Sequence, residues 1–517
     1  MKNIYKLFIL CSFVFVSCED TLLEPFTPGS LTPEIAIVTS NDLQQLMNST
    51  YQNFANREES VFGSVFTDEC GIGFANGGQG TTTDFVFNIN VTSNGPTVIW
   101  ETQYYALARA NRVIDFASKI VPVSPADADI LARLKAEALT IRAFAHLKLL
   151  SYFSSDVKSD GALAAVLVDK TFLSSDAPKQ RATNGEFYTS IHNDLNSAIA
   201  IFNGLTSPYT GIAATYYANR TTAKALKARA YALKGDYVNA AFWANDVINT
   251  SGITLATSLN YNNVFFTDNE PANTEVIFRL RRTPAQNTQA TNMHNGWCSV
   301  RPTASGSPFY EVGRSLFNLV NANPSDIRRT TIVSPSSLID PAYATSSDYR
   351  NTDRLIINKH GGVASGTTTA ASTAANGFNN DFKMIRLSEM YYILAESRAA
   401  VNDLPGAANF VKNVLDRRFP VAQIAPVYTS VANAFKGILD QRRIEFAYEG
   451  YRFIDLKRLA VLAGTGIDRD AADYSSSSTN YPGGNPANLP MSSFKWALPI
   501  PQSELSSNPS IQQNPGY

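Results

Sequence analysis

Aromatic and polar side chains that could bind a sugar lie on two segments that have the composition of loops. Sugars present apolar C–H faces and hydroxyl edges, so a sugar site needs exposed aromatic rings beside amide, carboxylate or guanidinium groups. Segments 62–94 and 294–310 offer this mixture, with candidate stacking residues Trp297, Phe309, Tyr310 and Phe74 and candidate hydrogen-bonding residues Asp68, Asn76 and Arg301. For each aromatic residue, the alternative is that its ring caps the hydrophobic core.

Sequence patterns of known catalytic sites do not occur in this chain. HExxH, GxSxG, a P-loop and a complete GxGxxG are missing, and the four histidines at 146, 192, 294 and 360 have no partners at helical spacing. We therefore predict no catalytic residues, no cofactor and no metal site. A carboxylate pair of the glycosidase kind is recognised by its separation in space and stays open as an alternative, with Asp68 and Glu69 as the first candidates.

Composition and charge exclude two classes of partner. The chain has 517 residues, of which 44% are hydrophobic, 17% charged and 11% aromatic, and its formal net charge is −1. This is the composition of a globular protein with a large core, in one domain or several. Because no basic field is available to hold phosphate groups, neither nucleic acid nor an anionic lipid surface is an expected partner.

Helical patterns that could position the loop residues cover much of the chain. Apolar residues at helical spacing predict helices over 41–54, from Trp100 onward, and over 125–153, where Ser124 is the expected N-cap before Pro125. Thr183 and Glu186 form a capping-box pattern at the start of another helix.

Two further segments have the pattern of antiparallel helix pairs. Segments 221–248 and 386–417 resemble tetratricopeptide units, with turns at 235–237 and 402–406. One such unit cannot bury its own apolar face, so we expect about four stacked pairs. Segment 251–381 has no long helical periodicity.

The densest set of charges lies in segment 441–459, where Gly450 separates two amphipathic halves. Buried charged groups are tolerated only when they are paired. We therefore interpret this set as an internal lattice of salt bridges and not as a catalytic cluster; its members are Arg442, Arg443, Glu445, Glu449, Arg452 and Asp455.

The same segment carries a family resemblance. Its run Arg443 to Arg458 resembles the RRxEFAxEGxRxxDLxR hallmark of SusD/RagB-like proteins, which are surface lipoproteins that work with TonB-dependent transporters in Bacteroidota. Other segments resemble further signatures of the family. They are the helix from Trp100, Glu137 to Ala145, Arg386 to Ala399, Asp326 with Arg328, and the C-terminal ALPIPQSELSSNPSIQQNPGY. The resemblance thus covers nearly the whole mature chain.

The first eighteen residues have the features of an export signal. Lys2 and Lys6 precede an apolar run of ten residues from Leu7 to Val16, and this run is too short to span a bilayer. Cys18 after Ser17 resembles the acylated cysteine of a lipobox, and the acidic pair that follows it resembles a surface-export signal. An ordinary secretory peptide is the alternative. We leave Cys70 and Cys298 unpaired, with a bridge between them as the alternative.

The resemblance implies a mainly α fold built on a tetratricopeptide-like scaffold with a loop-rich mixed α/β insertion. The expected organisation is a signal peptide (1–17), a lipid-anchored tether (18–33) and a SusD-like domain (34–517), with helical repeats mainly in 100–153, 184–250 and 383–459, ligand-side loops in 58–96 and 251–381, and a C-terminal strap in 490–517.

The resemblance also implies a function without bond cleavage. The protein is expected to capture an oligosaccharide at the outer-membrane surface and to pass it to a SusC-like TonB-dependent transporter, over which it closes as a lid. Two alternatives stay open, a receptor for peptides on the same scaffold and a surface glycosidase.

Overall fold

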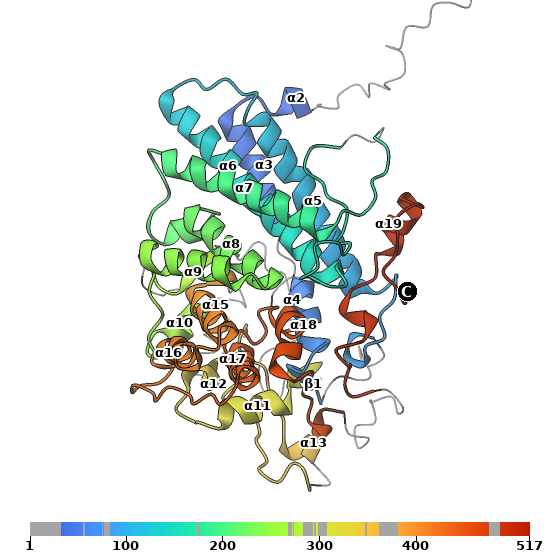
Figure 1. Ribbon diagram of the computed structural model, residues 1–517, viewed down its shortest axis with the longest axis vertical. Helices are drawn as coiled ribbons and strands as arrows, with labels where there is room; N and C mark the ends of the chain where they lie inside the picture. The colour runs from blue at the N-terminus through green and yellow to red at the C-terminus, as the bar shows by residue number, and fades with distance from the viewer. Residues whose placement is uncertain are drawn as a thin grey trace, which may run out of the picture.

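The computed structural model describes residues 33–54, 57–74, 76, 83–172, 176–266, 271, 273–282, 293, 296–297, 308–346, 349–360, 381–474 and 486–517. Within these ranges the protein is mainly helical, as expected, and its strands form two-stranded antiparallel sheets (Figure 1). The predicted anchor Cys18, together with Cys298 and Arg301, lies outside the described residues.

The N-terminal helices form the upper part of the molecule in Figure 1. After α2 (Pro33–Ala36) come α3 (Ser40–Phe54), α5 (Asn94–Phe116), α6 (Pro125–Phe153) and α7 (Asn184–Gly204), packed in the order α3, α5, α6, α7. The Ser124 hydroxyl accepts from the Asp127 amide at 3.2 Å, and Thr183 and Glu186 form the predicted capping box. Both predicted helix starts are confirmed. Each cap stabilises its helix because it accepts from a backbone amide that the first turn leaves without a partner.

Two helix hairpins continue this stack. The first consists of α8 (Arg220–Lys234) and α9 (Tyr237–Thr250), joined through Gly235 at a φ of 84°. The second consists of α15 (Leu387–Ala400) and α16 (Leu404–Leu415), and α15 packs against α9. Asp236 and Asp403 cap the two return helices by accepting from backbone amides three residues ahead. Both predicted helix pairs are present; the larger number of repeat units stays an interpretation.

Segment 441–459 forms the end of α17 (Val431–Glu445), a turn, and the start of α18 (Arg452–Ala463). Gly450 lies in the turn with a φ of 84°, a conformation that glycine adopts without strain. Helix α18 packs against α4 (Arg57–Val65), in a region where the sequence predicts a loop or short strand. That prediction is wrong for α4. A Cβ on Gly63 would lie 3.5 Å from the Gly450 Cα, so glycine at position 63 lets α4 lie close to the turn at Gly450. A glycine inside a helix also weakens the sequence pattern from which a helix is predicted.

Segment 251–381 contains only short elements among its described residues. These are α10 (Tyr261–Phe266), β2 (Val276–Leu280), β3 (Tyr310–Val312), α11 (Arg314–Asn321), α12 (Ile327–Ile332) and α13 (Tyr349–Thr352). Strand β2 pairs with β4 (Phe382–Arg386), which leads directly into α15. The segment is thus joined to the helical scaffold by a sheet as well as by side chains.

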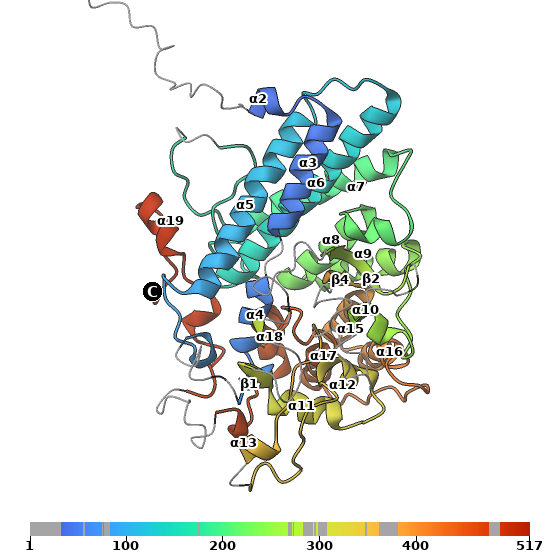
Figure 2. The same ribbon diagram turned by 180° about the vertical axis from the view of Figure 1, so that it is seen from behind.

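The C-terminal strap runs along the edge of the molecule (Figure 2). It is mostly extended, as expected, but contains the short helix α19 (Gln502–Ser507). The Asn514 amide donates to the carbonyls of Phe153 at 2.8 Å and Leu498 at 2.7 Å, which fixes the strap to the end of α6. None of the described helices combines the length and apolar character needed to cross a membrane.

A central ion network joins segment 441–459 to other parts of the chain. It consists of Glu275, Arg386, Arg418 and Glu445. Glu445 accepts from Arg386 and Arg418 at 2.7 Å each, and Glu275 lies 3.0 and 2.9 Å from the same two guanidinium groups. All four side chains are buried. Although burial alone would raise it, the neighbouring arginines hold the pKa of Glu445 well below its usual range.

Other members of the predicted lattice are paired in the same way. Arg442 holds Asp455 at 2.8 and 2.9 Å, and Glu449 accepts twice from Arg386 at 2.8 Å. Arg328 binds Asp326 at 2.6 Å, which confirms a structural role for that pair. The lattice interpretation is confirmed, and several of its partners come from outside segment 441–459.

Removing one member of the central ion network should lower the free energy of unfolding. Glu445→Gln leaves Arg386 and Arg418 to share their remaining carboxylate partners, so the buried network carries excess positive charge and we expect a loss of about 3–5 kcal/mol in the free energy of unfolding. The control is Asp440→Asn, which breaks the surface pair with Lys436 at 2.7 Å and should cost less than about 1 kcal/mol. Urea unfolding measures both, and equal losses would contradict the network's role.

A second buried carboxyl makes stability depend on pH. Glu137 on α6 accepts from the Tyr51 hydroxyl at 2.7 Å, and burial raises its pKa to about 7. The folded chain therefore holds a proton that the unfolded chain releases at lower pH. The resulting stabilisation is complete below the ordinary glutamate pKa and is lost as the pH rises to about 7.

We predict that Glu137→Gln removes this pH dependence. Between about pH 4.5 and pH 7, wild type should lose stability relative to the variant, on the order of 2–3 kcal/mol. Urea unfolding at several pH values tests this. Glu186→Gln is the control of opposite sign, since hydrogen bonds from Thr183 lower the pKa of Glu186. Parallel pH curves for wild type and Glu137→Gln would refute the assignment.

Candidate functional site

Strands β1 (Cys70–Ile72) and β3 bring the two predicted loop segments together. They pair antiparallel, with Cys70 opposite Val312 and Ile72 opposite Tyr310. The pairing continues beyond the strands, because the Gly73 amide donates to the Phe309 carbonyl at 2.8 Å. A Cβ at Gly73 would lie 2.2 Å from the Pro308 carbonyl oxygen, so only glycine allows this approach. Candidate residues from both segments therefore meet at one place.

A third segment joins them through Glu311. One oxygen of this buried carboxylate accepts from the Phe74 amide at 2.7 Å, and the other accepts from the Leu355 amide at 3.0 Å. This brings in Arg354, whose guanidinium carbon lies 4.1 Å from the centre of the Phe74 ring. We call the surface formed by Phe74, Phe309, Tyr310 and Arg354 the loop junction.

The side chains of the loop junction are partly exposed. Phe74 with Arg354 forms a flat apolar and cationic surface, and such pairs bind planar or C–H-rich groups while the guanidinium donates hydrogen bonds. Tyr310 leans toward the buried Phe85, with ring centres 6.5 Å apart, and its burial raises its pKa. Phe74, Phe309 and Arg354 are therefore better placed than Tyr310 to meet a ligand.

Trp297 supports the loop junction from below and does not offer a ring to solvent. It is 0% exposed and stacks on His360, with ring centres 5.3 Å apart. Its carbonyl accepts from the amides of Phe309 at 2.9 Å and Tyr310 at 3.1 Å. The prediction of Trp297 as a stacking residue is corrected: of the two alternatives, its indole takes the core-capping position.

Asn76 and Asp68 are also buried. The Asn76 amide donates to the Phe309 carbonyl at 2.8 Å and so shapes the junction from within. Both oxygens of Asp68 bind Arg452 at 2.7 Å. Burial would raise the pKa of Asp68, but Arg443 and Arg452 hold it well below its usual range. Both side chains are 0% exposed, in contrast to the prediction that they bind a ligand at the surface.

The suspected carboxylate pair has no access to substrate. Asp68 and Glu69 are 0% and 1% exposed. Burial raises the pKa of Glu69 to about 7, and one of its oxygens accepts from the Tyr448 amide at 3.2 Å. Two carboxyls that differ in charge at neutral pH resemble an acid and base pair, but a glycosidase must bring both to the scissile bond. The described part of the chain also has no cluster of three potential metal ligands.

Arg354 was not found by sequence reasoning. It lies 280 positions from its ring partner Phe74, and no motif surrounds it. Its place depends on the bridge between Leu338 and Arg354 and on the two bonds to Glu311. A local sequence signal for such a long-range pairing does not exist.

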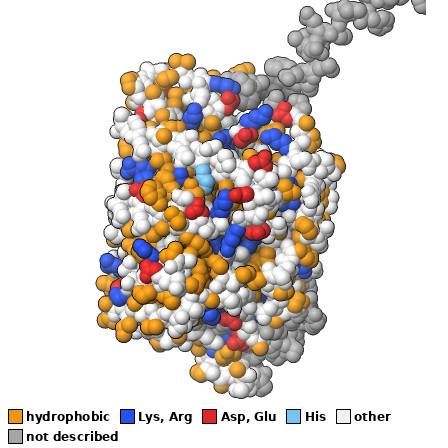
Figure 3. Space-filling view, in the orientation of Figure 1, with side chains coloured by type: hydrophobic (Ala, Val, Ile, Leu, Met, Phe, Trp, Pro, Cys, Tyr) orange, Lys and Arg blue, Asp and Glu red, His pale blue; other side chains and the backbone are white. Residues whose placement is uncertain are grey.

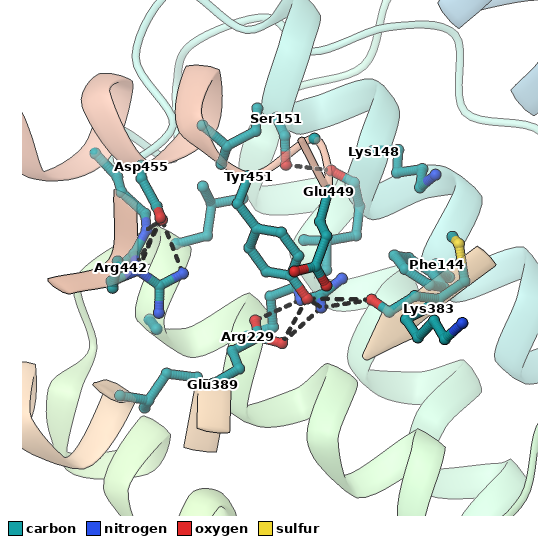
Figure 4. Close-up of a pocket in the computed structure, with 18 of the residues that line it drawn as sticks. Phe144, Lys148, Ser151, Arg229, Lys383, Glu389, Arg442, Glu449, Tyr451 and Asp455 are labelled. Carbon is teal, nitrogen blue, oxygen red and sulfur yellow. Dashed lines mark hydrogen bonds and ion pairs between the residues drawn. The ribbon is translucent and has the colours of Figure 1, made fainter. Parts of the chain in front are cut away.

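An internal cavity of about 90 Å³ lies among α6, α8, β4, α15 and α18 (Figure 4). Arg229 binds Glu389 at 2.6 and 2.7 Å, and the Tyr451 hydroxyl accepts from Arg229 at 2.7 Å. A water needs roughly 10–15 Å³ of such space, whereas ligand pockets measure about 300–1,000 Å³. The cavity therefore has room for a few waters and none for an oligosaccharide.

Comparisons with known proteins agree with this architecture. A model described as "Starch-binding associating with outer membrane" matches residues 32–233, and a model of the SusD family matches residues 334–517. "SusD-like protein P2" of Formosa agariphila is 24% identical, with the whole of both chains covered.

Solved structures share the fold along most of the chain. A SusD superfamily protein of Bacteroides thetaiotaomicron has a TM-score of 0.74 and 23% identity, covering 92% of this chain and 100% of its own. Surface glycan-binding protein A of Bacteroides fluxus has a TM-score of 0.67 and 20% identity, covering 93% and 100%. Because the SusD-type models that match residues 32–233 and 334–517 together cover more than half of the chain, this protein belongs to the SusD/RagB family.

Proposed function

We propose that this protein is a surface receptor that captures oligosaccharides at the loop junction. The observation that carries the proposal is the partly exposed Phe74 ring, covered by the Arg354 guanidinium and set beside Phe309 on a frame of three paired segments. A ring carried by a paired backbone stacks on a sugar at a lower ordering cost than a ring on a free loop, and the guanidinium donates to hydroxyl groups. The glycan-binding name of the Bacteroides fluxus protein supports this ligand class.

The protein acts by binding and does not cleave its ligand. Asp68 and Glu69, the first candidates for a catalytic carboxylate pair, are buried and engaged in holding the scaffold. Capture is followed by transfer to a SusC-like TonB-dependent transporter, over which the protein closes as a lid. It is held at the outer-membrane surface by a lipid on Cys18; the family model that names association with the outer membrane supports this location.

The transporter contacts the helical face formed by α9 and the end of α15. Val238 and Phe242 on α9 are 78% and 63% exposed, and Val401 after α15 is 66% exposed. Figure 3 shows hydrophobic side chains gathered on this side of the molecule, over the helix hairpins. Exposed apolar side chains that gather on one face are typical of protein interfaces.

Loss of the junction aromatics should weaken glycan binding. Phe74→Ala and Phe309→Ala should each reduce affinity about tenfold, equivalent to about 1.4 kcal/mol of lost stacking. Affinity electrophoresis of the full chain in gels of soluble polysaccharides, with a peptide digest as competitor, measures this. Phe242→Ala is the matched control and should bind as wild type does. Absence of retardation in every polysaccharide, with binding to peptide, would move the protein to the peptide-receptor class.

Transporter binding should depend on the other face. Val238→Asp with Phe242→Asp places two charges in an apolar contact and should reduce co-purification of the transporter at least tenfold. Phe74→Ala should leave co-purification unchanged. The opposite pattern, with loss only in Phe74→Ala, would overturn the assignment of the two faces.

A further inference from the structure

An open depression of about 490 Å³ lies between α7 and α8, on the helical scaffold. A second depression of about 900 Å³ adjoins it along α7, and the two share Asp160, Gly185, Thr189 and Asn193. Helices α7 and α8 lie in the upper and middle parts of Figure 1, whereas β1, which leads to the loop junction, lies in the lower part. The depression has the volume of a small-molecule site and is separate from the loop junction.

The wall of the depression contains a stack of three aromatic rings. His192 lies between Tyr188 and Tyr231, with ring centres 6.4 and 4.1 Å away and interplanar angles of 18° and 20°. Tyr188 is buried and donates to the Val157 carbonyl at 2.8 Å, which fixes the base of the stack. Tyr231 is partly exposed at the other end. The stack therefore presents a rigid ring to solvent.

His192 takes part in this stack as an apolar group. Burial lowers its pKa to about 4, so the imidazole is neutral at pH 7. Neither ring nitrogen has a hydrogen-bond partner among the described residues. Ring nitrogens that are buried without partners cost free energy, and stacking on two tyrosine rings offsets part of this cost.

Polar groups of both kinds surround the ring of Tyr231. Lys234 pairs with Asp160 at 2.7 Å across the depression, and Asp236 lies beside them as the N-cap of α9. Asn193 is exposed at the rim. Donors and acceptors are therefore both available, and the mixed charges favour a neutral hydroxyl-rich ligand over a strongly charged one.

Close packing of α7 on α8 does not require an exposed tyrosine. The buried side of α8 is rich in alanine, which already allows close approach, and Ala225, Ala228 and Ala232 are all buried. We propose that the depression is a second carbohydrate-contact site, where a neutral sugar unit stacks on Tyr231 and bonds to Asn193, Lys234 and Asp236. This goes beyond capture at the loop junction. A polysaccharide long enough to touch both places gains avidity from the second contact.

The test compares variants of the full chain by affinity electrophoresis in gels of soluble starch, xylan or galactomannan. Tyr231→Ala and Asn193→Ala should each weaken binding about threefold to tenfold, and Tyr231→Phe, which keeps the ring, should bind nearly as wild type. Tyr209→Ala is the matched control, because Tyr209 also stacks on a tyrosine, with ring centres 4.3 Å apart, but does not line this depression. Asn193→Ala keeps the test valid if Tyr231→Ala fails to fold, since Asn193 is exposed.

The outcomes separate this site from the loop junction. Weaker binding in Phe74→Ala, with unchanged binding in Asn193→Ala and Tyr231→Ala, would overturn the second site and leave the proposed function intact. Weaker binding only in Tyr231→Ala and Asn193→Ala would support the second site and reject the loop junction. Losses in both sets, greater when combined, support both. If wild type is retarded in none of the three gels, both proposals are rejected for these glycans.

Discussion

The cost of burying charge is the constraint on which this structure depends. Glu275, Arg386, Arg418 and Glu445 are removed from water together, and each is tolerated only because the others are in place. They come from four parts of the chain: the edge of β2, the end of β4, the turn after α16 and the end of α17. Bringing the four together holds segment 251–381, the helix hairpin of α15 and α16, and helix α17 in one arrangement.

The same principle extends to the loop junction. Arg452, at the first position of α18, binds Asp68, and Asp68 lies two residues before β1. The Asp68 carbonyl accepts from Arg443, and the Glu69 carbonyl accepts from the hydroxyl of Tyr448 at 2.7 Å. The strand that supports Phe74 is therefore fastened directly to the turn between α17 and α18. Helical scaffold and loop junction form one continuous set of contacts.

Features that depend on neighbours in sequence could be predicted, and features that depend on distant partners could not. Ser124, Thr183 and Gly235 mark helix ends through bonds within a few residues, so the sequence contains the whole signal. The density of charge in 441–459 also sufficed to predict pairing, because buried charges have few other solutions. Exposure is different. Whether Trp297 faces solvent depends on His360 and Tyr448, and no local pattern reports their approach.

The contrast between the ion network and the loop junction has an evolutionary consequence. Because Glu275 and Glu445 share the same two arginines, a change at any of the four positions is tolerated only with compensating changes at the others. The Phe74 and Phe309 rings are partly exposed and sit on a frame whose bonds join main-chain groups and the Glu311 carboxylate, without using either ring. If the loop junction is the binding site proposed above, substitutions there alter what is recognised at little risk to folding. Such a division would let one inherited scaffold change its ligand while its interior resists drift.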